Sequence, residues 1–559
     1  MRTVGSLLAG LVVAGTVAGQ STAPRIASYQ IAVDLRPSSD TIQFHVELLL
    51  SRAGREADTL RLDLIDMVID DVRWIDPITL MRADTVAAHP GQSIAVITAG
   101  AIGTPVSYRY DGRVLRVPLG HLEVPESGEF VVIRYHGKPR DGLIIGVNAR
   151  GRRSVFADNW PERARFWIPT VDRPDAKAKV AFLVAVPQGW RAVANGITPR
   201  WQESNDDVWT WTETRPIPPY TMVFGAGEFT VSQHRPVING RDTIPIQVWT
   251  YPEDSAFADS VPFRRATEIV EVMQRLIAPF PYEKLAHVQS STKFGGMENS
   301  SAIFYAEKPY VERKMGEGVV RHETAHQWFG DAVTERDWPD IWLSEGFATY
   351  FDGVIGAALD GDSVLVNRMR SNAEAYFKSD VTDRPIVDSG YAADPIKLLN
   401  ANSYPKGAWV LHMLRGIVGD SAFFRGLRAY YQTYRDSNAT SEDFQHVMER
   451  ASRTDLGWFF RQWLHQPGYP QLEVSWHYDA GAHRAVVGIT QHQKAEWGVF
   501  RLPALTLEFH GPAGAAARRT VAVTGRESSL NVAVPFAPTE IRVDPDGKLL
   551  LQTTATARR

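Results

Sequence analysis

The spacing of apolar residues changes twice along this chain of 559 residues, and no other feature limits its fold as much. Up to about residue 249, short runs rich in β-branched and aromatic residues alternate with Gly, Pro, Asp and Asn, which is typical of strands and turns. Between residues 263 and 464, apolar residues recur at steps of three and four, as in amphipathic helices. Beyond Pro470 the strand pattern returns. The sequence therefore predicts an α+β protein with several domains.

Individual elements can be placed by the same patterns. One helix is expected from Phe263 to Ile277, with Ser260 as its cap. Further helices are expected at Gly318–Phe329, Leu343–Leu359, Pro405–Ile417, Ser421–Tyr434, Glu442–Ala451 and Leu456–Leu464. N-terminal strands are expected at Thr41–Leu50, Glu129–Tyr135, Lys179–Val186 and Val208–Thr214. C-terminal strands, which predict a small β-sandwich, are expected at Leu472–Tyr478, Ala485–Gln491, Ala504–Phe509, Ser529–Val534 and Glu540–Val543.

The first residues have the pattern of a secretory signal. A positive start, Met1-Arg2, precedes fifteen apolar or small residues from Gly5 to Gly19, too few for a bilayer span of about 20 residues. We expect a signal peptide over residues 1–19, with an uncleaved anchor as the alternative, and a mature protein that is exported, periplasmic or secreted, with no stable membrane span. The domains expected after it are an N-terminal all-β domain (26–249), an α-rich domain (250–466) and a C-terminal β-sandwich (467–559).

Charge and cysteine content exclude several classes of function. Lys and Arg number 60 and Asp and Glu number 64, for a net charge of −4, so no basic excess is available to bind phosphate backbones. Nucleic acid is therefore not an expected partner. The chain has no cysteine, which excludes disulfides, thiolate metal sites and cysteine nucleophiles.

A candidate metal site lies in the helical region. The segment His322-Glu323-Thr324-Ala325-His326 has the pattern H-E-x-x-H. On a helix, residues four apart lie on one face, about 6 Å from each other. Two such imidazoles can bind one zinc ion, while Glu323 lies beside them and can reach a metal-bound water. For the five residues alone, the alternative is an amphipathic helix whose histidines pack or face solvent.

A third ligand is expected at Glu345. It lies nineteen positions after His326, in an otherwise apolar helical stretch, where an unpaired charge is costly. Three protein ligands leave one position for water, which is the arrangement of a catalytic zinc site rather than a structural one. The sequence thus predicts one Zn²⁺ per chain.

Four motifs in order resemble those of the M1, or gluzincin, aminopeptidases, which include aminopeptidase N and leukotriene A4 hydrolase. They are His322–Thr334 (HETAHQWFGDAVT), Trp342–Phe351 (WLSEGFATYF), the exopeptidase-like Gly295–Asn299 (GGMEN) and Tyr404–Gly407 (YPKG), which resembles Y-x-K-G. The resemblance extends over at least residues 166–469. It implies a thermolysin-like catalytic domain between the two β-rich regions.

The resemblance also implies a function. The enzyme would be a zinc-dependent aminopeptidase that hydrolyses the N-terminal peptide bond by metal-activated water, with Glu323 as general base and Tyr404 stabilising the oxyanion. Glu298 would bind the free α-ammonium group, so the expected partners are peptides with a free N-terminus. The implied zinc ligands are His322, His326 and Glu345. The implied substrate-binding residues are Gly295, Gly296, Met297, Glu298 and Asn299.

The chain departs from the family pattern in two places. Many members have a Gln or Glu nine or ten residues before the proline that matches Pro169, and it helps to bind the amine. Here Asn159, Trp160 and Glu162 are the candidates for this second amine anchor. The larger relatives also carry a helical C-terminal domain, which we expect to be absent because the residues after Pro470 have a strand pattern.

Two other functions remain open on the sequence alone. An epoxide hydrolase, as in the leukotriene branch of the family, would use the same zinc site. A catalytically inactive scaffold on the same fold is disfavoured by the intact set of motif residues, because an inert protein has no need for a general base beside a metal.

Overall fold

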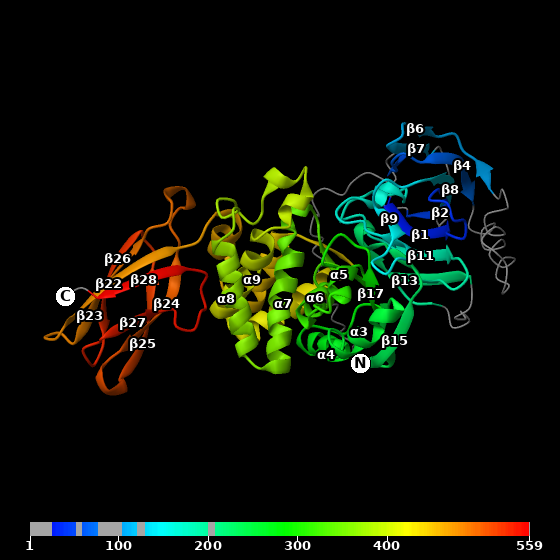
Figure 1. Ribbon diagram of the computed structural model, residues 1–559. Helices are drawn as coiled ribbons and strands as arrows, with labels where there is room; N and C mark the ends of the chain where they lie inside the picture. The colour runs from blue at the N-terminus through cyan, green and yellow to red at the C-terminus, as the bar shows by residue number, and fades with distance from the viewer. Residues whose placement is uncertain (1–24, 52–58, 76–102, 120–128, 199–206, 558–559) are drawn as a thin grey trace, which may run out of the picture.

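The computed structural model describes residues 25–51, 59–75, 103–119, 129–198 and 207–557 (Figure 1). The expected signal peptide, residues 1–19, lies outside these ranges. Within them, no helix is both long and apolar enough to cross a membrane. Figure 1 shows the N-terminal sheets (blue to cyan) at one end of the molecule, the helices (green to yellow) in the middle and the C-terminal sheets (orange to red) at the other end.

The described residues of the N-terminal region form three sheets. The largest has the order β13-β11-β1-β2-β8-β4-β5, with β1 parallel to β11 and antiparallel to β2. Its strands are β13 (Val208–Ile217), β11 (Ala178–Ala185), β1 (Arg25–Asp34), β2 (Ile42–Ser51), β8 (Glu129–Gly137), β4 (Val68–Ile75) and β5 (Thr104–Pro105). The smaller sheets join β12 (Arg191–Ala194), β14 (Phe224–Gly227), β10 (Arg153–Ala157) and β9 (Leu143–Val147), and β3 (Thr59–Asp63), β7 (Val114–Pro118) and β6 (Arg109–Tyr110). The predicted all-β character of this region is confirmed.

The two-residue period of the sequence explains which face of the large sheet is buried. In β8, alternate residues Val131, Ile133 and Tyr135 have no exposed surface, and Phe44 of β2 stacks on Tyr135 with ring centroids 5.0 Å apart. The Tyr135 hydroxyl donates a hydrogen bond to the backbone oxygen of Trp167, 2.5 Å away. This bond connects the sheet to the segment that follows Trp160.

A mixed five-stranded sheet joins the β-rich region to the helices. Its order is β15 (Thr230–Asn239), β16 (Asp242–Thr250), β17 (Leu285–Ser290), β19 (Ala302–Ala306) and β18 (Gly296–Met297). Strand β17 is parallel to both neighbours and is buried along its whole length, as expected for an inner parallel strand. The predicted boundary between residues 249 and 250 lies inside this sheet, because β16 spans it and belongs to the same sheet as β18, which carries Gly296 and Met297 of the GGMEN segment.

The helices of the described chain include seven that lie close to predicted positions and three, at residues 255–260, 307–311 and 363–377, that were not predicted. They are α3 (Ser255–Ser260), α4 (Ala266–Leu276), α5 (Glu307–Val311), α6 (Glu317–His326), α7 (Trp342–Asp360), α8 (Ser363–Phe377), α9 (Gly407–Val418), α10 (Asp420–Tyr434), α11 (Ser441–Ser452) and α12 (Gly457–Phe460). The prediction that Ser260 caps the helix that follows it is wrong. Ser260 is the last residue of α3 and its hydroxyl donates back to the Ala256 carbonyl (2.6 Å), a local bond that serine also favours.

The C-terminal strands form two sheets. One has the order β26 (Glu527–Ala533), β23 (Arg484–Gln491), β22 (Gln471–Asp479) and β28 (Gln552–Ala557). The other has the order β25 (Ala516–Val523), β24 (Leu502–His510) and β27 (Glu540–Val543). Their alternating buried residues, such as Val487 of β23 and Leu507 of β24, fill the space between them, as the predicted β-sandwich requires.

Trp497 fastens the sandwich to the helical region. Its indole nitrogen donates to Asp383 (2.7 Å), and its ring lies 5.1 Å from that of Tyr469. Gly468 passes directly beneath this ring with φ of +77°, and a Cβ there would lie 2.1 Å from the Trp497 Cδ2 atom. Only glycine fits, because both the backbone angle and the space exclude a side chain.

We predict that Gly468→Ala destabilises the junction. The matched control is Gly361→Ala, at φ of +96° with no atom within 4 Å of an added Cβ, so it carries the backbone strain alone, on the order of 1–2 kcal/mol. Gly468→Ala adds overpacking of about 1–3 kcal/mol. Thermal unfolding should therefore show a lower midpoint for Gly468→Ala than for Gly361→Ala, and equal midpoints would contradict this account of the junction.

Candidate metal centre and active site

Helices α6 and α7 carry the candidate ligands and are joined by a buried ion pair. Arg321 of α6 donates through Nε to Asp352 Oδ1 of α7 (2.8 Å) and through Nη1 to Glu317 (2.8 Å). Arg368 of α8 pairs with the other oxygen of Asp352 (2.5 Å). The side chains of Arg321, Asp352 and Glu317 are largely removed from solvent, so the relative position of α6 and α7 is fixed by charge-assisted bonds. Sequence patterns gave no sign of this pairing.

Three atoms converge between these helices. The Nε2 atoms of His322 and His326 lie 3.1 Å apart, and the Glu345 Oε2 atom lies 3.3 Å from each. This oxygen is buried and accepts no well-aligned hydrogen bond. Ligand atoms about 2.0–2.1 Å from a tetrahedral zinc ion are separated by roughly 3.3 Å, so the triangle has the size and chemistry that zinc requires.

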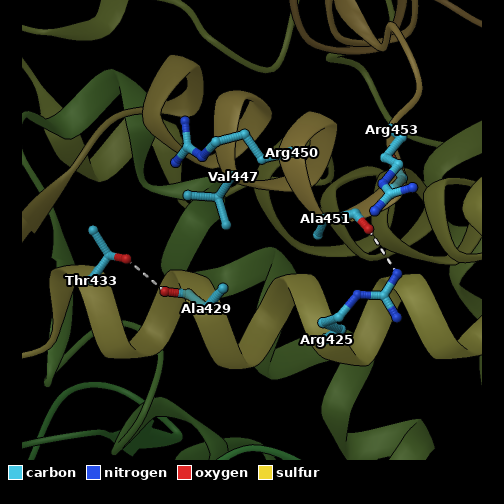
Figure 2. A pocket seen from close by; sticks show the side chains of 8 residues that line it. Arg425, Ala429, Thr433, Val447, Arg450, Ala451 and Arg453 are labelled. Carbon is cyan, nitrogen blue, oxygen red and sulfur yellow. Dashed lines mark hydrogen bonds between the residues drawn. The ribbon is translucent and has the colours of Figure 1, made fainter.

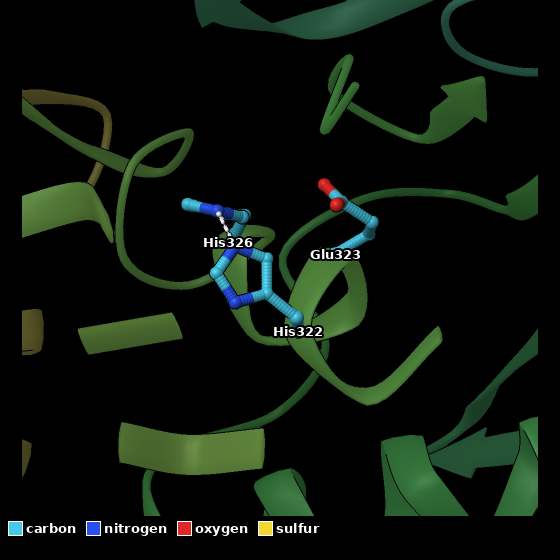
Figure 3. Close-up of side chains that lie close together, drawn as sticks. All are labelled: His322, Glu323 and His326. Carbon is cyan, nitrogen blue, oxygen red and sulfur yellow. Dashed lines mark hydrogen bonds between the residues drawn. The ribbon is translucent and has the colours of Figure 1, made fainter. Parts of the chain in front are cut away.

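Glu323 lies beside this triangle on the same turn of α6. Figure 3 shows both imidazoles and the Glu323 carboxylate, and one ligand-type atom from each of the three lies within 4.8 Å of the others. We take Glu345 rather than Glu323 as the third candidate ligand, because a single Glu345 oxygen is equidistant from both ring nitrogens. Glu323 therefore remains available for a role other than metal binding.

The second ring nitrogen of His326 has two protein partners. Its Nδ1 atom lies 3.2 Å from the Phe329 carbonyl oxygen and 3.0 Å from the Ser344 hydroxyl. An Nδ1–H donated to the carbonyl leaves the lone pair on Nε2, where a metal would bind. Gly330 permits this approach, since a Cβ there would lie 2.3 Å from the Ser344 Oγ atom. Ser344 was not identified from the sequence, although it directly precedes Glu345.

The electrostatics of the site favour positive charge. Burial raises the pKa of Glu323 and of Glu298. Burial opposes a proton on His326, but the neighbouring carboxylates, Glu345 foremost, outweigh it and raise the His326 pKa to about 10. Burial likewise opposes ionisation of Glu345, yet the adjacent imidazoles lower its pKa. The cluster holds more carboxylates than cations, which suits it to cationic ligands.

The GGMEN segment lies against α6. A Cβ on Gly296 would be 2.2 Å from Glu323 Oε1, whereas one on Gly295 would meet nothing. A side chain at position 296 would therefore overlap the general-base candidate itself. Gln327, which directly follows α6, donates to the Glu298 carbonyl oxygen (2.8 Å) and accepts from the Ser301 amide (2.7 Å). The segment is thus held in register with the metal site.

Met297 and Asn299 flank the remaining residue of this motif. Both are buried, and neither side-chain polar atom of Asn299 has a hydrogen-bond partner among the described residues. The Glu298 carboxylate between them also forms no ion pair within the described chain, and 5% of the residue is exposed.

Tyr404 reaches the same site from the opposite side. It lies in η7 (Asn402–Lys406), a single π-helical turn just before α9. Its hydroxyl donates to Glu345 Oε1 (2.7 Å), and its ring is parallel to the His322 ring at 6.0 Å. The structure therefore brings together all the predicted metal-site and catalytic residues.

The three candidates for a second amine anchor have other partners. Asn159 donates to the Pro219 and Met222 carbonyl oxygens (3.3 and 2.7 Å) and accepts from the Trp167 indole (2.8 Å). Trp160 packs edge-on against Trp338, with ring centroids 5.5 Å apart.

The third candidate, Glu162, accepts from the Trp338 indole (3.0 Å) and pairs with Arg165 (2.7 Å). The polar atoms of Asn159 and Glu162 are thus engaged within the protein.

A separate cavity of about 570 Å³ lies between α10 and α11 (Figure 2). Its lining includes Arg425, Arg450 and Arg453, and Arg425 donates to the Ala451 carbonyl oxygen (2.7 Å). None of the predicted site residues lines it.

Comparison with known proteins agrees with this geometry. Residues 263–463 match the peptidase family M1 domain. This part of the chain is similar to the catalytic domain of peptidase family M1. The M1 domain and the converging donor atoms assign a single zinc ion to the site.

Relatives of known sequence include probable aminopeptidase 2 of Sulfurisphaera tokodaii, 27% identical over 79% of this chain and 58% of that protein. Human glutamyl aminopeptidase is 29% identical over 59% of this chain and 36% of that protein. The chain thus spans less than two thirds of the length of these curated relatives.

Solved structures share the fold. The M1 zinc metallopeptidase of Deinococcus radiodurans superposes with a TM-score of 0.65 at 22% identity, covering 81% of this chain and 98% of that chain. Aminopeptidase A of Legionella pneumophila superposes with a TM-score of 0.74 at 16% identity, covering 96% of this chain and 60% of that chain.

We predict that Ser344→Ala weakens zinc binding by about 10- to 100-fold, because the hydroxyl that orients His326 is lost. Titration against a chelator of known affinity measures this change. The control is Thr349→Ala in the same helix, whose hydroxyl has no hydrogen-bond partner among the described residues. An affinity as high in Ser344→Ala as in the control would remove Ser344 from the support of the metal site.

Proposed function

We propose that this chain is a zinc aminopeptidase that removes N-terminal residues from peptides. The observation that supports it most is the Glu298 carboxylate, buried beside the metal site without a cationic partner among the described residues. A buried carboxylate needs a positive partner, and the α-ammonium group of a peptide supplies one. The aminopeptidase names of the curated relatives support the same activity.

His322, His326 and Glu345 would hold the zinc ion. When bound, zinc supplies activation of a water molecule and polarisation of the scissile carbonyl. The protein contributes the placement of the three donor atoms, which α6 and α7 fix through the Arg321–Asp352 pair. It also orients His326 through the Phe329 carbonyl and Ser344.

Glu323 would act as the general base. Burial raises the pKa of its carboxylate, so it accepts a proton from the attacking water more readily than an exposed glutamate does. The same carboxyl group can then deliver that proton to the leaving amine nitrogen. Gly296 keeps the Glu323 side chain in place without a competing methyl group.

Tyr404 would stabilise the negative charge that develops on the carbonyl oxygen. Burial keeps the pKa of its hydroxyl well above the ordinary value, so the proton stays on the phenol and is available for donation. Its present acceptor, Glu345 Oε1, places the hydroxyl at the edge of the metal site. One such donor typically contributes about 10²- to 10³-fold in rate.

We also propose that the protein acts outside the cytoplasm after removal of a signal peptide near Gly19. The positive start and the short apolar run support this location. Identification of the N-terminal residue of the exported protein tests this proposal, because cleavage near Gly19 is expected.

Hydrolysis of aminoacyl anilides tests the proposed activity. Zinc-loaded protein should cleave substrates with a free amino group, and a chelator should abolish cleavage until zinc is restored. Glu323→Gln should retain zinc and lose nearly all turnover, since the amide cannot accept the proton. Full turnover by Glu323→Gln would exclude it as the base. Diol formation from a fatty-acid epoxide without anilide cleavage would instead support the epoxide hydrolase.

Removal of the Glu298 carboxylate should act selectively on the free amine. We predict that Glu298→Ala lowers kcat/KM for free aminoacyl anilides by about 100-fold or more, equal to the loss of a buried charge pair of roughly 3 kcal/mol. Residual cleavage of N-acetylated anilides should stay the same. Equal losses on both substrates would refute contact between Glu298 and the ammonium group.

A further inference from the structure

Helices α7 and α9 meet at a pair of glycines. A Cβ on Gly407 would lie 2.9 Å from the Cα atom of Gly346, and a Cβ on Gly346 would lie 2.9 Å from the Gly407 Cα and carbonyl carbon atoms. Carbon atoms in ordinary contact are about 3.5–4.0 Å apart. Since the atoms that would be met belong to the backbone, no side-chain rotation can relieve the overlap. The two helices are in backbone contact because both residues are glycine.

This contact joins the two groups that face each other across the site. Gly346 directly follows Glu345, and Gly407 directly follows the turn η7 that carries Tyr404. The Tyr404 hydroxyl lies 2.7 Å from Glu345 Oε1, so the separation of the two backbones sets the separation of these two side chains.

Other bonds hold both partners in place away from the contact. On the side of η7, the Ser403 hydroxyl donates to the Leu398 carbonyl oxygen (2.6 Å) and the Lys406 ammonium donates to that of Gln466 (3.3 Å). On the side of α7, Asp352 is bound to Arg321 of α6. The glycine pair is thus the element that determines how closely η7 approaches α7.

We propose that the Gly346–Gly407 contact is a positioning element that places the Tyr404 hydroxyl at the metal site. The proposal rests on the oxyanion role given to Tyr404 above. A methyl group at position 407 would separate the backbones by roughly 0.5–1 Å, the difference between the present approach and an ordinary contact. A displacement of about 1 Å at a reacting group can lower the rate about 100-fold.

Gly407→Ala in zinc-loaded protein tests this. We expect kcat on an aminoacyl anilide to fall about 10- to 100-fold, with KM and zinc affinity within about threefold of wild type. The control is Gly416→Ala in the same helix, which is exposed and has no atom within 4 Å of an added Cβ. It should leave kcat unchanged. A Gly407→Ala enzyme with wild-type kcat, or one whose loss comes entirely from weaker zinc binding, would overturn the proposal.

A double-mutant cycle separates positioning from a general loss of structure. In the Tyr404→Phe background the hydroxyl is absent, so Gly407→Ala should cause no further fall in kcat, although both variants should unfold at a lower temperature than their parents. A further fall as large as in wild type would overturn the proposal. If Gly407→Ala does not fold, Gly346→Ala inserts a methyl group into the same contact and the cycle applies unchanged.

The proposed function fails by different results. Zinc-loaded wild type without aminopeptidase activity would refute the activity, and Tyr404→Phe with full kcat would refute the oxyanion role. The positioning role fails by another result, namely independent effects of Gly407→Ala and Tyr404→Phe on kcat in the double-mutant cycle.

Discussion

The approach of Glu345 to the two imidazoles of α6 is the interaction on which the site depends. Glu345 lies in a buried stretch of α7, and its Oε2 atom is 3.3 Å from each Nε2 atom. A carboxylate in such surroundings is stable only beside positive charge. The buried Arg321–Asp352 pair between the same two helices keeps α6 and α7 at the separation that this geometry needs. Helices α6 and α7 therefore place the two imidazole nitrogens and the Glu345 oxygen close enough to bind one metal ion.

The β-rich region takes part in building the site. Lys177, just before β11, donates to the backbone oxygens of Asp331 and Ala332 (2.8 and 3.0 Å) in the loop after α6. Lys284 donates to Ala194 of β12 and to Ser301 after the GGMEN segment (2.8 and 3.0 Å). Lys284 is buried and Lys177 is partly buried, and desolvation lowers the pKa of each ammonium group to about 7. The two loops that border the active site are consequently fixed from the N-terminal sheets as well as from the helices.

Sequence patterns predicted the site residues better than they predicted the residues and helix contacts that hold the site residues in place. The H-E-x-x-H spacing and the carboxylate in an apolar helix suffice to place His322 and Glu345 together, because both follow from helix geometry and the cost of buried charge. Helix α8 escaped detection because only Met369, Asn372 and Tyr376 of its fifteen residues are buried, which leaves little apolar period. Ser344 and the glycine contacts depend on which elements meet in space, and a single sequence does not contain that information.

The carboxyl groups that give the site its chemistry also oppose its stability. Glu298 and Glu323 are buried and have raised pKa values, so the folded protein binds their protons more tightly than the unfolded chain does. Their contribution to stability is therefore lost as the pH rises above the ordinary range of a carboxyl group. A cation that binds beside them relieves this penalty and gains binding free energy from it. The buried carboxylates that destabilise the free protein thus make the site selective for positively charged ligands.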